Sequence, residues 1–153
     1  GTIASLWEAN MDLLGTVPRF QLMDQDRVIQ SRSPLAPPAF IEGEVVNSIV
    51  ATGCEIEGKV VNSVIGTDCI IEEGAYVADS VLMGNITVKS GAKINYSIID
   101  EDVTIGEKAV VGDVREKALK VESKTSGIAV LGRGVTVRKN GKVPAGEIVD
   151  KDV

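Results

Sequence analysis

Aliphatic residues recur every six positions through the middle of the chain. Three triplets follow this spacing, and their first members, Ile65, Leu82 and Ile99, are equally spaced along the chain. The triplets are Ile65, Ile71 and Val77; Leu82, Val88 and Ile94; and Ile99, Ile105 and Val111. An earlier turn, containing Val50 and Ile56, is two residues shorter. A period of six is typical of hexapeptide repeats, in which short strands alternate with corners.

A second series of small or aliphatic residues stands four positions after members of the first, and we expect its side chains to point inward too. It comprises Cys54, Val60, Cys69, Ala75, Val81, Ile86, Ala92, Ile98, Val103 and Ala109. One coil of three hexads cannot bury its apolar face alone, so several coils must stack at about 4.8 Å. The pattern therefore predicts a parallel β-helix, an all-β fold.

Serines give a second indication of the same period. Ser48, Ser63, Ser80 and Ser97 occupy one place in successive coils. Stacked one coil apart, they can share hydrogen bonds along a corner. We interpret this series as a structural ladder rather than as a site.

The chain opens with a segment whose apolar residues follow helical spacing. Thr2 is the expected N-cap and Gly15 the expected stop, so we predict a helix over residues 1–15. Its apolar face comprises Ile3, Leu6, Trp7, Met11 and Leu14. This face can pack on its own domain. We favour contact, in part, with a domain that precedes the helix in a longer protein, because the helix begins so abruptly.

Two further segments depart from the repeat. Residues 16–39 hold four of the five prolines, which predicts an extended linker entering a β-helix over residues 40–153. Residues 113–127 interrupt the hexads with a charged loop. Its basic side chains are Arg115, Lys117, Lys120 and Lys124. After this loop the short β-like segments resume and predict a closing coil.

Charge and composition narrow the class of partner. The net charge of −6 disfavours general attraction to nucleic acid or to an anionic membrane. No apolar run approaches the roughly 18 to 20 residues that span a bilayer, and no secretory signal pattern is present. We therefore expect a cytoplasmic protein that binds neither nucleic acid nor membrane.

Histidine is absent from the chain, which removes the commonest general base and metal ligand. β-Helical acyltransferases and carbonic anhydrases mostly depend on histidine, so both classes are disfavoured. Cys54 and Cys69 stand one repeat apart, at the inward position of Ile86 and Val103. We interpret them as core thiols, with a disulfide or a two-cysteine metal site left open. We predict no catalytic residue, no metal ligand and no cofactor site within this chain.

The charged loop is the one candidate site. Several basic side chains on a loop that breaks an acidic scaffold are suited to a phosphorylated ligand. From the pattern alone, a solvated insertion loop explains the same residues equally well.

Two kinds of motif carry a family resemblance. Residues 1–14, GTIASLWEANMDLL, resemble the segment that closes the catalytic domain of glucose-1-phosphate adenylyltransferases. Residues 42–50 (EGEVVNSIV), 97–106 (SIIDEDVTIG) and 126–135 (SGIAVLGRGV) resemble the C-terminal β-helix of that family. The resemblance covers nearly the whole chain, and it implies that the β-helix is left-handed.

The resemblance also implies an activity for a longer parent protein. Such a parent joins ATP and glucose 1-phosphate to ADP-glucose and pyrophosphate, in glycogen or starch synthesis. Mg²⁺ is held by the N-terminal catalytic domain, so this chain alone is expected to be inactive. The implied role of the chain is regulation and oligomerisation. Its implied partners are its own catalytic domain and further subunits, in a homo-tetramer or in a hetero-oligomer with a paralogous subunit.

The family binds small phosphorylated effectors where its two domains meet. It places a basic residue just before the SGI motif, and Lys124 is the nearest match here. A second basic position falls just before the IID motif, where this chain has Asn95 and Tyr96, with Lys93 slightly upstream. This departure leaves the identity of the effector open. The hypothesis is that Lys124, supported by Lys120, Arg115 or Lys93, neutralises an effector phosphate.

Three alternatives stay open at this point. The domain can belong to another sugar-phosphate nucleotidyltransferase that uses GTP, UTP or TTP. It can belong to a paralogous subunit that regulates without catalysing. A free-standing β-helix that binds a ligand or transfers an acyl group is the remaining class.

Overall fold

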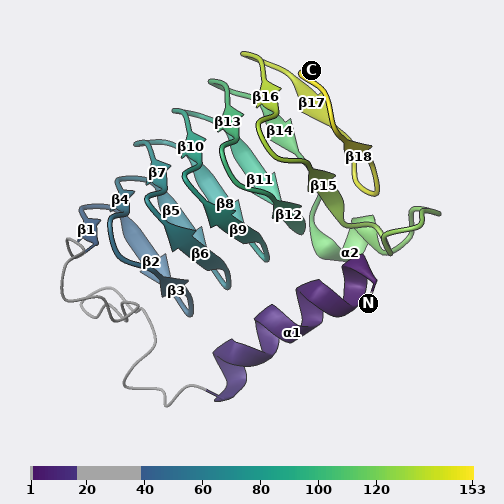
Figure 1. The fold of residues 1–153 in the computed structure, drawn as a ribbon, viewed down its shortest axis with the longest axis horizontal. Helices are drawn as coiled ribbons and strands as arrows, with labels where there is room; N and C mark the ends of the chain where they lie inside the picture. Colours follow the sequence, from purple (N-terminus) through teal and green to yellow (C-terminus); the bar gives the residue numbers. More distant parts are fainter. Residues whose placement is uncertain (1, 17–38) are drawn as a thin grey trace.

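The computed structural model describes residues 2–16 and 39–153, which form one helix beside a β-helix (Figure 1). The predicted linker over residues 16–39 lies outside the described residues except for its two ends. The β-helix has three parallel sheets of six strands, and the chain visits the sheets in turn so that one coil takes one strand from each.

The first two sheets hold twelve of the strands. Sheet 1 contains β1 (Phe40–Ile41), β4 (Glu55–Ile56), β7 (Ile70–Ile71), β10 (Thr87–Val88), β13 (Thr104–Ile105) and β16 (Thr136–Val137). Sheet 2 contains β2 (Glu44–Val46), β5 (Lys59–Val61), β8 (Tyr76–Ala78), β11 (Lys93–Asn95), β14 (Val110–Val111) and β17 (Lys142–Val143).

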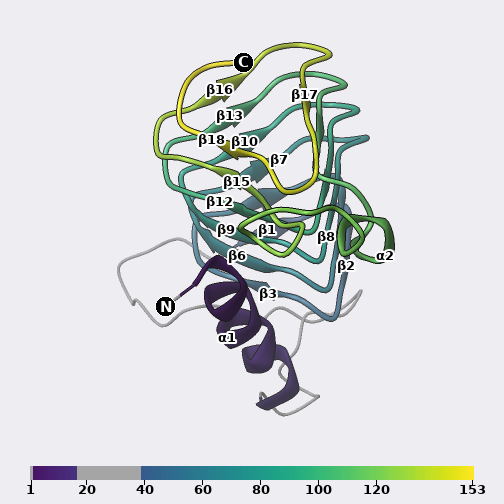
Figure 2. The ribbon, with the colours of Figure 1, turned by 90° about the vertical axis from the view of Figure 1, so that its right-hand side faces the viewer.

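Sheet 3 forms the side that faces the helix. Its strands are β3 (Ile49–Val50), β6 (Val64–Thr67), β9 (Val81–Gly84), β12 (Ser97–Ile99), β15 (Ala129–Leu131) and β18 (Ile148–Val149). Seen from the end of the molecule in Figure 2, the helix α1 (Ile3–Thr16) lies outside the coils.

The predicted register is confirmed. Ile65 pairs with Leu82, and Leu82 pairs with Ile99, so each triplet lies one coil beyond the triplet before it. All nine residues of the three triplets are at most 1% exposed. The expected fold class, a parallel β-helix of hexapeptide repeats preceded by a short helix, is therefore confirmed.

Two members of the second inward series do not point into the coils. Val81 and Ile98 are buried, but they belong to a separate cluster with Trp7 on the outer face of sheet 3. The reason is the alternation of side chains along a strand: in β9, Leu82 faces the core, so the preceding Val81 faces outward. The other members of the series lie in the main core.

The serine ladder is confirmed, and backbone groups link its steps. The N–H groups of Ser63, Ser80 and Ser97 donate to the hydroxyl oxygen of the serine one coil earlier, at 3.0, 3.1 and 3.2 Å. Each of the four hydroxyls donates in turn to the carbonyl two residues before it. All four serines are fully buried, so each step satisfies a backbone donor that no solvent reaches.

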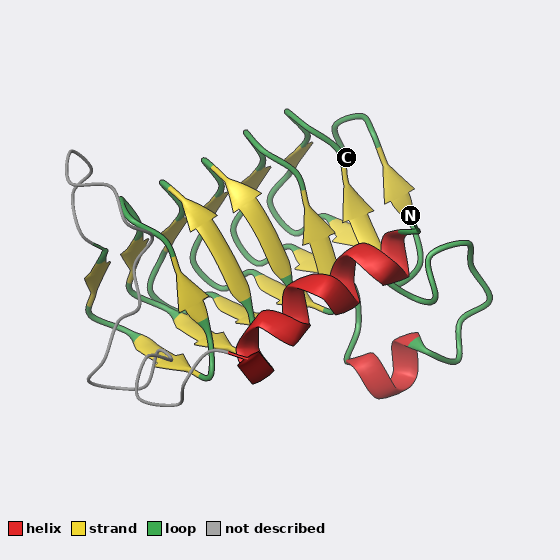
Figure 3. Ribbon diagram, turned by 60° about the horizontal axis from the view of Figure 1, so that its bottom comes forward, coloured by secondary structure: helices red, strands yellow, loops and turns green. Residues whose placement is uncertain are grey.

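The helix α1 begins as expected, because the N–H of Ser5 donates to Thr2 Oγ1 at 3.0 Å. It ends at Thr16, one residue past the expected stop at Gly15. Its Trp7 side packs on the outer face of sheet 3, against Val81 and Ile98. Figure 3 shows α1 running across several coils (red).

The charged segment inserts at one corner without disturbing the coils around it. Thr87 pairs with Thr104 one coil later, whereas Thr104 pairs with Thr136 across the insertion, so this coil is nearly twice as long as the one before it. The added length corresponds to residues 113–127, which we call the excursion. It contains the short helix α2 (Arg115–Ala118) and joins sheet 2 to sheet 3.

Candidate functional site

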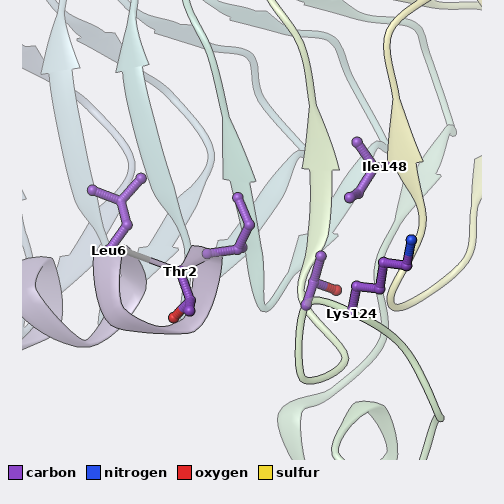
Figure 4. Close-up of a pocket in the computed structure, with 6 residues that line it drawn as sticks. Thr2, Leu6, Lys124 and Ile148 are labelled. Atoms are coloured by element: carbon purple, nitrogen blue, oxygen red, sulfur yellow. The ribbon is translucent and has the colours of Figure 1, made fainter.

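A cavity of about 540 Å³ lies between the start of α1 and the end of the excursion. We call it the α1 groove. The described residues that line it are Thr2, Ile3, Leu6, Lys124, Thr125 and Ile148. In Figure 4, Lys124 and Ile148 lie on one side of the groove, and Thr2 and Leu6 lie on the other. The groove therefore combines an apolar floor with one positive charge.

A hydrogen-bonded turn fixes the backbone on both sides of Lys124. Thr125 is buried, and its hydroxyl donates to the carbonyl of Ile128 at 2.6 Å. Ser123 Oγ accepts from the N–H groups of Thr125 and Gly127, at 3.3 and 2.9 Å. The Lys124 side chain is exposed at the mouth of this rigid turn, so it can reach a ligand without moving the backbone.

A second basic residue of the excursion contacts α1 through aromatic rings. The guanidinium carbon of Arg115 lies 4.8 Å from the ring centroid of Trp7 and 5.7 Å from that of Tyr96. The two rings meet edge to face, with centroids 5.0 Å apart and planes at 79°. We call these three residues the aromatic latch. Trp7 Nε1–H also donates to the carbonyl of Asp79 at 2.7 Å.

Tyr96 stands where the earlier coils have a small polar residue. Asn47, Asn62 and Asp79 precede the ladder serines with positive φ, and their side chains are linked by hydrogen bonds of 2.9 and 2.6 Å. Tyr96 holds the same backbone conformation, at φ 47°, and packs on Trp7 instead. Sequence reasoning did not identify Trp7 and Tyr96 as partners. The signal was a tyrosine at the place where the three earlier coils have Asn or Asp.

The structure brings two of the four predicted site residues to α1 and leaves two apart. Lys124 lines the α1 groove, and Arg115 stacks on Trp7. Lys120 is exposed elsewhere on the excursion, just after α2. Lys93 is exposed on sheet 2, beside Tyr76 and Val110 in the neighbouring strands, whereas the groove opens on the sheet 3 side.

A smaller hollow of about 300 Å³ continues along the other side of Ile3 and Leu6. Met83, Ile98, Val130 and Leu131 give it an apolar lining, and Asp100 and Glu101 stand at its edge. Arg133 binds Glu101 at 3.2 Å, so part of this acidic charge is already neutralised. The α1 groove therefore carries the clearer signal for an anionic ligand.

The two cysteines are free and buried in the core, in the column of Ile86 and Val103. A hydrogen bond with Cys54 and burial both raise the pKa of the Cys69 thiol. Cys54 Sγ–H donates to the carbonyl of Gly66 at 3.1 Å. Over the described residues, no three His, Cys, Asp or Glu side chains are grouped as a metal site would need.

No helix within the described residues is long and apolar enough to cross a bilayer.

The chain is similar in sequence to one protein family and to curated relatives of known activity. The family description "GlmU-like, C-terminal hexapeptide" matches residues 39–131. The glucose-1-phosphate adenylyltransferase of Acetivibrio thermocellus is 35% identical over 98% of this chain and 36% of its own length. That of Fervidobacterium nodosum is 38% identical over 99% of this chain and 38% of its own length. The chain thus spans little more than a third of these relatives.

Solved structures match more distantly. A mutant of GDP-perosamine N-acetyl transferase from Caulobacter crescentus, in complex with CoA and GDP-perosamine, aligns with a TM-score of 0.40 and 20% identity. The alignment covers 82% of this chain and 50% of that one.

Proposed function

This chain belongs to the GlmU-like, C-terminal hexapeptide family and is homologous to part of the glucose-1-phosphate adenylyltransferases, and we propose that it is the regulatory and assembly domain of such an enzyme. The resemblance drawn from its helix and β-helix motifs is thereby confirmed. Glycogen or starch synthesis and a cytoplasmic location belong to the same proposal.

The observation that carries the proposal is the coverage of the relatives. They match 98% and 99% of this chain, yet the chain makes up only 36% and 38% of them. The proposed parent transfers the adenylyl group of ATP to glucose 1-phosphate, with release of pyrophosphate. Its Mg²⁺ and its reacting groups belong, in this proposal, to residues outside this chain, so the chain alone has no activity.

The α1 groove is the proposed effector site. Lys124 supplies an exposed ammonium group on a rigid turn, which suits a phosphate or a sugar phosphate. The Arg115 guanidinium over the Tyr96 ring places a further positive charge at the corner where the family resemblance calls for a basic residue. Lys120 and Lys93 stand further out and are proposed to add attraction rather than direct contact.

Assembly is the second proposed role. Leu6 and Leu13 of α1 are 40% and 46% exposed, so part of the apolar surface of the helix is not covered by the β-helix. We propose that this surface packs on the catalytic domain of the parent, in a homo-tetramer or with a paralogous subunit. The bulk of the β-helix then acts as a stiff arm between subunits.

An assay of the full-length parent tests the activity. Pyrophosphate release from glucose 1-phosphate is measured with ATP, GTP, UTP and TTP in turn, with this chain alone as a control. We expect a clear preference for ATP and no release by the chain alone. Release with another nucleotide only would favour a different sugar-phosphate nucleotidyltransferase, and no release with any of them would favour a non-catalytic subunit.

A further inference from the structure

The attachment of α1 to the β-helix depends on a residue far along the chain. We infer that Arg115 is a positioning residue that latches α1 onto sheet 3, so that docking of the helix follows the conformation of the excursion. This inference goes beyond the proposed function, because it concerns contacts within this chain and requires neither nucleotide nor effector.

The aromatic latch spans from the buried corner to the surface. Tyr96 and Trp7 are 3% and 5% exposed, whereas Arg115 is exposed. A guanidinium over the face of an aromatic ring is attracted by the negative charge density of that face. Arg115 lies over both rings of an edge-to-face pair, so a single side chain restrains the ring from α1 and the ring from the corner together.

The excursion holds Arg115 in place through α2. Ala118 lies on the same short helix, three residues after Arg115, and is fully buried in the cluster that contains Trp7 and Tyr96. Residues three apart on a helix face the same side. A movement of α2 would therefore withdraw the Arg115 cation from Trp7 and the Ala118 methyl group from the cluster that contains Trp7.

The other apolar contacts of α1 differ along the helix. Leu14, near its end, is 7% exposed, whereas Ile3, Ala4 and Met11 are only partly buried against the cluster. The α1 groove and the smaller hollow both open beside Ile3 and Leu6, so packing is incomplete along the first half of the helix. The hydrogen bonds of Ser5 and Asn10 stay within the helical segment. The latch and the bond from Trp7 to Asp79 therefore carry much of the docking of the first half of α1, and the buried Leu14 adds to it near the end of the helix.

Tyr96 shows that the corner is adapted to the latch. A bulky side chain at φ 47° is disfavoured, and Asn or Asp tolerates this conformation better. In the earlier coils, Asn62 donates a side-chain hydrogen bond to Asp79 at the same place one coil later. A tyrosine at this place does not continue that series. Its ring contact with Trp7 is the interaction gained in exchange.

Hydrogen exchange on this 153-residue chain tests the latch. Amide exchange of α1 scales with the equilibrium for opening of the helix. Loss of an exposed cation–π contact in Arg115→Ala should speed exchange in α1 about two- to fivefold, with no change in β9 and β12. Arg115→Lys keeps the charge without the planar group, so its exchange rate in α1 should lie between those of the parent chain and Arg115→Ala. Lys117→Ala is the matched control and should behave as the parent chain.

Trp7 is the only tryptophan of the chain, so its fluorescence gives a second reading. Acrylamide is uncharged and quenches exposed tryptophan, and we expect stronger quenching in Arg115→Ala. Tyr96→Asn should also free Trp7, and because a buried ring is lost, thermal melting of the β-helix should fall as well. Unchanged α1 exchange and quenching in both variants, or an equal effect of Lys117→Ala, would overturn the inference.

Discussion

The interior of the coils and the outer face of sheet 3 are built on opposite principles. Inside, each neighbourhood recurs: Ile71, Val88 and Ile105 stack in one column and see nearly the same surroundings. Outside, Trp7 and Arg115 meet in a cluster that occurs once. Repetition gives stability and a straight scaffold, but it cannot distinguish one position from another. We therefore expect a ligand or partner to bind where the repeat is interrupted.

The largest contrast should come from truncating the core. Ile94→Ala leaves a cavity in a fully buried column between Val77 and Val111, and we expect a loss of about 2–5 kcal/mol in the free energy of unfolding. Leu6→Ala, at a position of α1 that is 40% exposed beside the α1 groove, should cost well under about 1 kcal/mol. Urea unfolding followed by circular dichroism measures both. Equal losses would remove the distinction between the two regions.

A substitution in the serine ladder should cause the second-largest loss of stability. Ser80→Ala leaves the N–H of Ser97 without its acceptor in a fully buried corner, which costs about 1–3 kcal/mol. A matched control is Ser90→Ala at an exposed corner, with an expected change within about 0.5 kcal/mol. If urea unfolding shows Ser80→Ala to be as mild as the control, the ladder is not a source of stability.

Alkaline pH should weaken the core through Cys69. Because its pKa is raised in the folded state, Cys69 stays protonated there, whereas the unfolded thiol ionises above about 8.5. The unfolded state then binds fewer protons at this thiol, so the contribution of Cys69 to stability is complete below that pH and is lost progressively above it.

A double variant isolates the thiols from other groups that titrate near pH 10. Cys54→Val with Cys69→Val keeps apolar side chains of the type found at Val103 in the same column. Urea unfolding at pH 8, 9 and 10 should show a shallower pH dependence for the variant. The same slope in both proteins would assign the effect to other residues.

The smallest effect on stability is expected at the candidate site. Lys124 is exposed and its backbone is held by Ser123 and Thr125, so Lys124→Ala should change the free energy of unfolding by less than about 0.5 kcal/mol. Thermal melting beside Lys139→Ala, an exposed lysine at a corner of sheets 1 and 2, gives the comparison. A larger loss at Lys124 would mean that it holds the fold together.

The contrast between the repeated interior of the coils and the unique outer face of sheet 3 explains which features could be predicted from the sequence. The triplet spacing predicted the strand register correctly, because each coil repeats the same local sterics. It misplaced Val81 and Ile98, since spacing alone does not show that a helix covers the outer face of sheet 3. Lys124 was proposed from a motif, whereas the partnership of Trp7, Tyr96 and Arg115 depends on contacts among residues that lie far apart in the chain. No local pattern encodes such contacts.

We propose that regulation resides at the break in the repeat, and the response of the full-length parent to effectors tests this claim. Pyrophosphate release by the full-length parent is followed against increasing fructose 1,6-bisphosphate, and separately against phosphate, for Lys124→Ala and Lys139→Ala. We expect Lys124→Ala to keep basal activity but to need about tenfold more effector, as for the loss of one charge-assisted hydrogen bond, with Lys139→Ala unchanged. A normal response of Lys124→Ala to both anions would contradict the claim.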